Sequence, residues 1–226
     1  MRLLVVSLLL FICLEAQATR LPFPVLPGGG VAFLDVTSIR EQRFSNIVEQ
    51  KTDFSCGAAS LATVLREAYN LDLDEQTVIE GMLVGADQEL VRSQGFSMLD
   101  MKRYAENLGM RARGYRLDPA GLQQLKVPVV VLQEVRGYKH FVVLMRSEAD
   151  RVYIGDPVLG HKRYTMDEFV SGWNGIIFAV IGPGYDRENA LLDPPEPLTA
   201  KHRINQFRPV QDAELMEFGF IQSDFF

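Results

Sequence analysis

The spacing of apolar residues changes near Val127, and this change constrains the fold more than any other feature of the sequence. Before it, apolar residues recur at helical spacing in segments 56–69, 74–83 and 97–108. After it come short segments rich in β-branched and aromatic residues, separated by turn residues, at 127–132, 138–145, 151–156 and 175–181. Helices followed by an antiparallel sheet predict an α+β fold, with the N-terminal helices packed on the sheet.

Capping residues support the starts of the predicted helices. Ser55 precedes the first helical segment and is expected to be its N-cap. Ser97 and Asp100 have the spacing of a capping box at the start of another. Asp118, which is followed by a proline, is typical of the start of a short helix.

The first 18 residues have the pattern of a secretory signal peptide. Arg2 is followed by an apolar run over 3–14 and by the small-x-small sequence Ala16-Gln17-Ala18. The run is too short to cross about 30 Å of hydrocarbon comfortably. We therefore expect residues 1–18 to be removed and the mature chain to reach the periplasm. Lipidation at Cys13 is the alternative.

The remaining chain is predicted to have three parts. Residues 19–30 are rich in proline and glycine and are expected to be a flexible lead-in. The domain is expected to span 31–184, and 185–226 is expected to be a polar C-terminal tail. The formal charge is −6, and acidic and basic residues are mixed along the chain. Without a basic stripe, nucleic acid is excluded as an expected partner.

Cys56 is the candidate nucleophile. The chain has two cysteines, and removal of residues 1–18 would leave Cys56 alone in an oxidising compartment, where unpaired thiols are uncommon. Cys56 lies at the predicted first turn of its helix, where free N–H groups and the helix dipole stabilise a thiolate. The alternative is that Cys56 is a small buried apolar residue.

A cysteine nucleophile needs a base, and the chain has three histidines. His202 lies in the predicted tail among charged residues, and His161 lies in a predicted turn beside Lys162. Both are expected to be at the surface. His140, within a predicted strand, is therefore the candidate base.

Asp156 is the candidate partner of His140. A five-residue hairpin connection over 146–150 would place Leu144 opposite Val152 and His140 opposite Asp156. Opposed side chains lie close enough for a carboxylate to accept an imidazole N–H, which would orient the ring. A shift of the register by one residue would move the two side chains to opposite faces.

Acyl transfer also requires donors for the developing oxyanion. The backbone N–H of Cys56, at the predicted start of a helix, is one candidate. Gln50 lies six residues upstream, and its side-chain amide is the second candidate. An ordinary surface glutamine is the alternative for Gln50.

Taken together, these motifs resemble peptidase family C39 of the papain-like clan. The matching segments, in family order, are Gln50, Cys56-Gly57-Ala58, Tyr138-Lys139-His140-Phe141 and Ile154-Gly155-Asp156-Pro157. The resemblance covers roughly residues 50–181 and implies a papain-like fold. It implies Cys56 as nucleophile, His140 as general base and then acid, Asp156 as orienting acid and Gln50 as oxyanion donor.

The residues after the domain show neither the membrane spans nor the phosphate-binding loop of the transporter-linked members of this family. The chain is similar instead to free-standing exported members, especially those encoded with Fap functional-amyloid secretion systems. This resemblance implies a polypeptide substrate, with amyloid subunits or their export machinery as candidate partners. Because the family favours cleavage after paired glycines, Gly28-Gly29-Gly30 is a candidate self-processing site, with a plain linker as the alternative.

Three functions are consistent with these residues. The leading hypothesis is a periplasmic cysteine endopeptidase, which needs no cofactor, and the histidines have no spacing typical of a metal site. The second is another thiol reaction on the same fold, by a transglutaminase or a cell-wall amidase. The third is a binding module without turnover, against which the presence of Cys56 argues.

Overall fold

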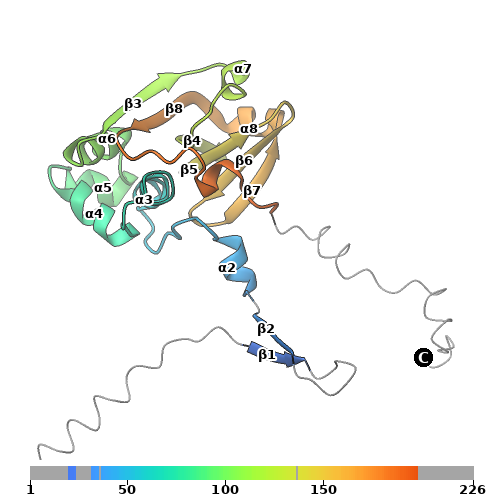
Figure 1. Cartoon of the computed structure of the whole chain (residues 1–226). Helices are drawn as coiled ribbons and strands as arrows, with labels where there is room; N and C mark the ends of the chain where they lie inside the picture. The colour runs from blue at the N-terminus through green and yellow to red at the C-terminus, as the bar shows by residue number, and fades with distance from the viewer. Residues whose placement is uncertain (1–19, 24–31, 36, 136, 198–226) are drawn as a thin grey trace, which may run out of the picture. The chain divides into compact units, whose positions relative to one another are not determined.

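The computed structural model describes residues 20–23, 32–35, 37–135 and 137–197 (Figure 1). The predicted signal peptide, the Gly28–Gly30 run and His202 lie outside these residues. The chain divides into two compact units, residues 1–42 and 43–226. No helix in the described part of the chain is both long and apolar enough to span a membrane.

The first unit contains a pair of short strands. Strand β1 (Arg20–Phe23) pairs antiparallel with β2 (Ala32–Asp35), so that Arg20 lies opposite Asp35. Residues 20–23 lie within the segment predicted to be a flexible lead-in, and in the structure they form a strand. Their backbone groups find partners in 32–35, which no local pattern indicates.

The second unit begins with helices. After the short α2 (Ile39–Arg43), which spans the boundary between the units, the helices are α3 (Cys56–Tyr69), α4 (Glu75–Leu83), α5 (Gln88–Gln94) and α6 (Met98–Asn107). Helices α3, α4 and α6 match the predicted helices closely. The predicted capping box of Ser97 and Asp100 is present at the start of α6. Helix α5 was not predicted, because it is short and only Val91 is buried.

A six-stranded antiparallel sheet follows, in the order β3-β8-β4-β5-β6-β7. Its strands are β3 (Arg111–Arg116), β4 (Val129–Val135), β5 (Tyr138–Ser147), β6 (Arg151–Asp156), β7 (Gly160–Thr165) and β8 (Trp173–Ile181). The sequence predicted the four inner strands but not β3 and β7. Those two are the edges of the sheet; β3 is largely exposed and β7 is partly exposed, so they lack a strong apolar signal. The predicted α+β class is confirmed.

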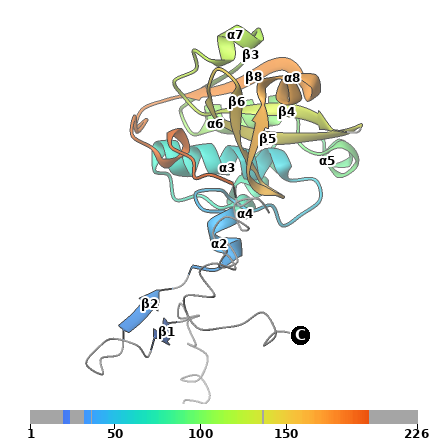
Figure 2. The ribbon, with the colours of Figure 1, turned by 90° about the vertical axis from the view of Figure 1, so that its right-hand side faces the viewer.

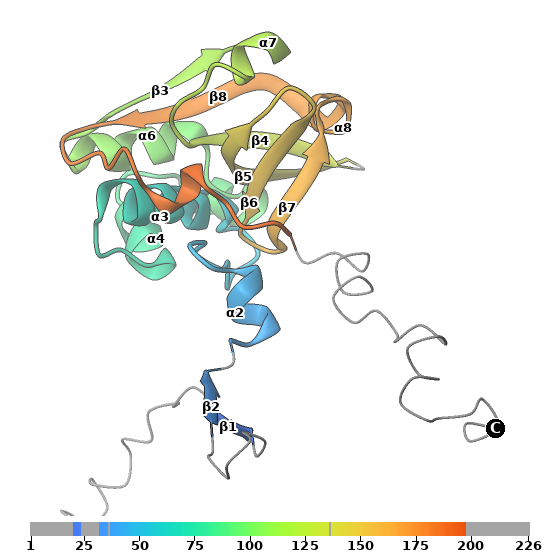
Figure 3. The same cartoon turned by 45° about the vertical axis from the view of Figure 1, so that its right-hand side comes forward.

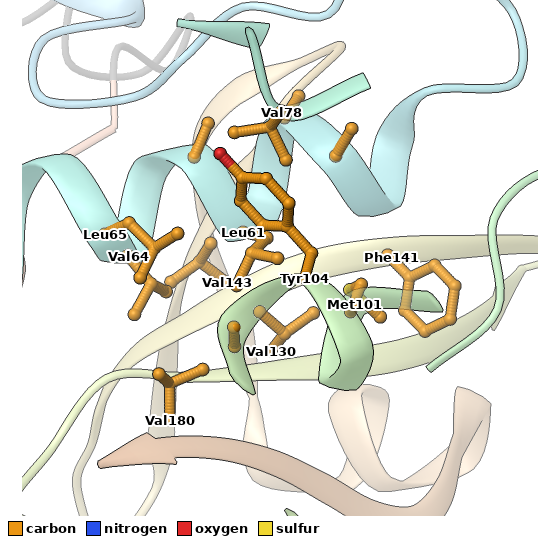
Figure 4. Close-up of a cluster of buried hydrophobic side chains, with 14 of the residues drawn as sticks. Leu61, Val64, Leu65, Val78, Met101, Tyr104, Val130, Phe141, Val143 and Val180 are labelled. Carbon is orange, nitrogen blue, oxygen red and sulfur yellow. The ribbon is translucent and has the colours of Figure 1, made fainter. Parts of the chain in front are cut away.

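Two apolar cores lie on the two faces of the sheet. Helices α3 and α6 pack on one face and α4 packs on these two helices; Leu61 of α3 and Val143 of β5 are fully buried there (Figures 2 and 4). On the other face, Leu144 of β5 packs with Phe169 of α8 (Met166–Gly172) and Leu122 of α7 (Pro119–Leu122). Successive residues of β5 therefore contribute to different cores, as the alternation of side chains along a strand requires.

The packed part of the chain continues beyond the predicted boundary at residue 184. Residues 185–197, drawn in orange-red in Figure 3, include a 3₁₀ helix (Ala190–Leu192) in which Leu191 is fully buried. The backbone N–H of Asp186 donates to Ala68, and the rings of Tyr185 and Tyr69 meet edge to face at 5.5 Å. The packing of this segment was not predicted, because its few buried apolar side chains stand among many polar residues.

The predicted register of β5 and β6 is wrong by two residues. Leu144 lies opposite Ile154 rather than Val152. The pairing continues closer to the turn than predicted, with Ser147 opposite Val152, and a β-bulge between Leu144 and Arg146 then shifts it by one residue. A shift of two residues keeps every side chain on its original face. His140 and Asp156 therefore remain on the same face, displaced diagonally instead of directly opposed.

Candidate active site

Cys56 is the first residue of α3 and is a partly exposed free thiol. Ser55 occupies the N-cap position, as predicted, but its side chain makes no capping hydrogen bond. Its hydroxyl is hydrogen-bonded instead to the Thr52 carbonyl oxygen and to the Glu75 carboxylate. The Ser55 side chain therefore does not compete for the N–H groups of the first helical turn, which favour a negative charge on the adjacent thiol.

His140 and Asp156 are both buried and in contact. Nε2 of His140 lies 3.0 Å from Oδ1 of Asp156. The same carboxylate oxygen accepts the backbone N–H groups of Val158 at 2.8 Å and Leu159 at 2.9 Å. With three donors on one oxygen, the carboxylate is held in a single orientation and holds the imidazole with it.

The turn that supplies these two N–H groups ends at a glycine. Gly160 has a φ of +74°, and an added Cβ would lie 2.2 Å from the carbonyl oxygen of Arg43. The side chain of Arg43 also donates to the carbonyl oxygen of Leu159, at 2.6 Å. Because only glycine accepts both the positive φ and this close approach, the orientation of Asp156 depends on Gly160.

The second imidazole nitrogen is turned away from Asp156. Nδ1 of His140 is buried and makes no close hydrogen bond with any residue that the structure describes. The Cys56 thiol nevertheless lies near enough to stabilise the charged imidazole. Since Nε2 is held by Asp156, Nδ1 is the nitrogen left to face the thiol, and such contacts often tighten only when substrate is bound.

His140 and Asp156 stabilise each other's charged forms. Burial lowers the pKa of His140, but the hydrogen bond with Asp156 and the electrostatic interactions with Asp156 and Cys56 outweigh this and raise the pKa to about 9. Burial raises the pKa of Asp156, but the hydrogen bond and charge of His140, together with the two backbone N–H groups, lower it overall. At neutral pH the site therefore holds an imidazolium beside a carboxylate.

Gln50 lies at the same corner of the molecule. Its backbone N–H donates to the carbonyl oxygen of Pro157, at 2.9 Å, directly after Asp156. Its side-chain nitrogen donates to the carbonyl oxygen of Thr52, at 2.5 Å. A carboxamide has two N–H groups, so one remains for a ligand beyond the one that Thr52 accepts. The role of Gln50 as an oxyanion donor remains a prediction.

No pattern in the sequence indicated the role of Glu75. This carboxylate is only 4% exposed, although Glu75 is the first residue of α4. It accepts the backbone N–H of Lys51, with distances of 3.0 and 3.1 Å to its two oxygens, and also the hydroxyl of Ser55. Glu75 therefore anchors the irregular segment between Gln50 and Cys56. An acid at a helix start is common, so the sequence did not distinguish it.

His161 is buried, so the prediction that it lies at the surface is wrong. Its Nε2 lies 2.7 Å from the carbonyl oxygen of Ser45, which identifies Nε2 as the protonated nitrogen, and burial lowers the pKa of the ring. His161 thus joins β7 to the segment that precedes Gln50. Among the described residues, no cluster of three His, Cys, Asp or Glu side chains suits a metal ion.

Two cavities flank the candidate catalytic residues. One, of about 360 Å³, contains Cys56 and is lined by α5, α6 and their connection, including Leu90, Phe96 and Leu99. The other, of about 430 Å³, contains His140 and Asp156. An extended polypeptide that crosses the thiol and the imidazole would therefore have a cavity on each side.

Comparison with known proteins gives consistent results. Residues 45–182 match the profile of the Peptidase C39 family. Over all 226 residues, and over the full length of each relative, the chain is 67% identical to a protein of Pseudomonas aeruginosa and 66% identical to one of Pseudomonas fluorescens, each described as "Probable functional amyloid protease FapD". The crystal structure of a double glycine motif protease from an AMS/PCAT transporter, in complex with the leader peptide, aligns with a TM-score of 0.50 at 28% identity and covers 60% of this chain and 89% of that one.

Proposed function

Since this chain belongs to the peptidase C39 family, we propose that it is an exported cysteine endopeptidase whose nucleophile is Cys56. Family membership confirms the resemblance found in the sequence, the papain-like α+β fold and the assignment as a cysteine peptidase. The observation that carries the proposed site is the 3.0 Å contact between His140 and Asp156, with Cys56 beside the same imidazole at the start of α3.

The first step is attack by the Cys56 thiolate on the scissile carbonyl carbon. A C–S bond forms, and the carbonyl oxygen becomes an oxyanion. In this proposal, the backbone N–H of Cys56 and the free side-chain N–H of Gln50 donate to it. Fixed donors of this kind stabilise the developing charge because they need no reorganisation when it appears.

The second step expels the leaving group. The imidazolium of His140 donates its Nδ1 proton to the nitrogen of the scissile bond, and the C–N bond breaks. Asp156 keeps the proton on Nε2, so the ring presents Nδ1 to the substrate. The amine product leaves, and a thioester on Cys56 remains.

Water then completes the cycle. Neutral His140 takes a proton from water at Nδ1, and the resulting hydroxide attacks the thioester carbon. The C–S bond breaks, the acid product leaves, and the thiolate of Cys56 again faces an imidazolium. Each half of the cycle uses the same nitrogen, first as acid and then as base.

We propose that the substrate is a secreted protein of an amyloid system and that cleavage takes place in the periplasm. The pattern of residues 1–18 supports export. The description of the two Pseudomonas relatives as probable functional amyloid proteases supports amyloid subunits or their export machinery as partners. The description of a structural relative as a double glycine motif protease supports cleavage after paired glycines.

The reactivity of the thiol tests the proposed nucleophile directly. We expect iodoacetamide to alkylate Cys56 in the native protein faster than in the same protein unfolded in denaturant at the same pH. The His140→Ala variant should lose this advantage. Equal rates for the native and unfolded wild-type protein would overturn the assignment.

Mass spectrometry of exported proteins tests the proposed substrate and compartment. Cells that produce the wild-type protein should yield cleaved peptides that are absent when the Cys56→Ala variant is produced at the same level. The variant is a matched control because it changes one partly exposed side chain. Identical peptide sets from the two cultures would contradict the proposal.

A further inference from the structure

The cavity beside His140 and Asp156 is mostly apolar. Its floor contains Val142 and Ile154, which are buried side chains of β5 and β6. Around it stand Tyr138, Val158, Leu159 and Tyr164. We refer to the cavity lined by these six side chains, Gln133 and the catalytic pair as the dyad pocket.

Large apolar side chains are exposed around the dyad pocket. Tyr138 is 60% exposed, Val158 is 49% exposed and Leu159 is 40% exposed. The ring of Tyr138 also lies 5.9 Å from that of His140, measured between centroids. Exposed apolar groups that gather beside reactive residues indicate a binding surface, because exposing them to water has a cost that a ligand relieves.

The two cavities differ in charge. The cavity that contains Cys56 is lined by Asp87, Asp100, Arg103 and Lys139 as well as by apolar groups. The dyad pocket has no lysine or arginine among its described lining residues, and its charged groups, His140 and Asp156, bind each other. It therefore suits an uncharged apolar side chain rather than an acidic or basic one.

Strand β5 separates the two cavities. Lys139 and Phe141 line the cavity that contains Cys56, whereas Tyr138, His140 and Val142 line the dyad pocket. A substrate that reaches both Cys56 and His140 must cross the line between these two sets of side chains. One part of the polypeptide then lies over each cavity.

The chemistry assigns the two parts. After attack, the acyl part of the substrate is bonded to Cys56, while the nitrogen of the leaving part must lie at His140 to receive its proton. Resting on the function proposed above, we propose that the dyad pocket binds the side chain of the residue that follows the scissile bond. The residue it selects is aliphatic or aromatic, such as leucine or phenylalanine.

Acyl transfer from Cys56 to added amines tests the dyad pocket separately from the binding of the acyl part of the substrate. The acyl donor is the thiobenzyl ester of acetyl-Gly-Gly, which has no residue after the scissile bond. Cys56 displaces benzyl thiolate and forms the acyl enzyme, which then partitions between water and an amino-acid amide. In the second case the C–S bond breaks, a C–N bond forms, and the proton of the amine passes to His140 as the thiolate is restored.

The measurement is the ratio of acetyl-Gly-Gly amide product to free acid, determined by mass spectrometry. Leucinamide and phenylalaninamide should give about tenfold higher ratios than glycinamide or aspartic acid amide at equal concentration, as expected for one apolar side chain in one pocket. Because the ratio is internal to a single acyl enzyme, it does not depend on how fast that enzyme forms.

Substitution in the dyad pocket should change this preference. Val158→Asp should abolish the advantage of leucinamide and favour lysinamide, while the backbone N–H of residue 158 still reaches Asp156. Tyr164→Ser makes the same test from strand β7, whereas Val158 lies in the turn before that strand, and it should also reduce the leucinamide ratio. Ile181→Asp is the matched control, because Ile181 is 47% exposed on β8 and lies outside the dyad pocket.

The outcomes separate the pocket from the catalytic proposal. If the wild-type protein forms no acyl enzyme on Cys56, the proposed function fails and the pocket assignment fails with it. If the acyl enzyme forms but all amides give equal ratios, only the pocket assignment is overturned. Equal preferences in wild-type, Val158→Asp and Tyr164→Ser proteins would also overturn it.

Discussion

The proposed active site is built from two regions that are held in different ways. The sheet side consists of His140 and Asp156 on β5 and β6, each strand being paired with a neighbour on both sides. The helix side consists of Cys56 and the irregular segment 50–55 before it, which Glu75 anchors. The sheet side therefore has many redundant backbone bonds, whereas the helix side depends on a few side-chain contacts.

Substitutions in the two regions should therefore have different effects on activity and stability. On the sheet side, a side chain can change while the strand ladders keep the backbone in place, so activity and stability should separate. On the helix side, the loss of one anchoring group should disturb both the fold and the position of the thiol.

Cys56→Ala should remove peptidase activity, with a loss of at least about 10⁴-fold, because no other group replaces the nucleophile. The side chain is partly exposed, so thermal unfolding should change little. Turnover of acetyl-Gly-Gly 4-nitroanilide and the melting temperature measure the two effects. Residual hydrolysis that iodoacetamide does not inhibit would contradict the assignment of Cys56.

Asp156→Asn should reduce turnover by about 10²- to 10⁴-fold, because the carboxylate no longer holds the Nε2 proton or stabilises the imidazolium. The fold should remain, since strands β5, β6 and β7 stay paired. Kinetics on the anilide, with circular dichroism as the control, check this separation. Unchanged turnover would refute the orienting role of Asp156. Unfolding of the variant would contradict the expectation that substitutions on the sheet side leave the fold intact.

Gln50→Ala should reduce kcat by about 10²-fold if the side-chain amide donates to the oxyanion. The substitution also removes the hydrogen bond to Thr52, so a small loss of stability should accompany it. Gln50→Glu is the sharper variant, because it keeps the size of the side chain but cannot donate when ionised. Activity close to that of the wild type in both variants would assign the second oxyanion donor elsewhere.

Raising the pH should reduce turnover of the anilide by about tenfold for each unit above the pKa of His140, which is about 9. The leaving amine needs the imidazolium proton, whereas benzyl thiolate does not, so hydrolysis of the thioester should not show this decline.

The raised pKa of His140 also makes the stability of the protein depend on pH. A raised folded pKa gives stability that is fully present below 6.5 and is lost as the pH rises through about 9. Urea unfolding of wild type and His140→Ala over this range measures it.

Glu75→Ala should have the smallest effect on turnover, a few-fold, but should lower the free energy of unfolding by about 1–3 kcal/mol. The Lys51 N–H and the Ser55 hydroxyl would lose a buried acceptor. Glu80→Ala, on the exposed face of the same helix, is the control and should leave both quantities nearly unchanged. A stability equal to that of wild type would show that the helix side does not depend on this anchor.

The sequence predicted the main elements because their apolar spacing is strong. Helices α3, α4 and α6 and strands β4, β5, β6 and β8 each bury one or both faces, so their periodicity is visible. Helix α5 and strands β3 and β7 were missed because they are short or lie at an edge. The segment 185–197 was assigned to a tail because a few anchoring side chains such as Leu191 stand among polar residues.

The site was predicted in part for a similar reason. The face on which His140 and Asp156 lie follows from the two-residue alternation of a strand, and this survived an error of two residues in the register. The roles of Ser55, Glu75 and His161 were not predicted correctly. Each depends on a partner far away in the sequence, such as Glu75 for Ser55 and Ser45 for His161.

By itself, therefore, the sequence determined which side chains are available for chemistry, which elements carry them and which face of a strand each occupies, because those properties depend on neighbours a few residues away. Only the tertiary structure decided how the strands are aligned, which carboxylate anchors the segment before Cys56, and that an apolar pocket adjoins His140. Those features arise where distant segments pack together, and the free energy of that packing depends on shape and partners that local spacing does not encode.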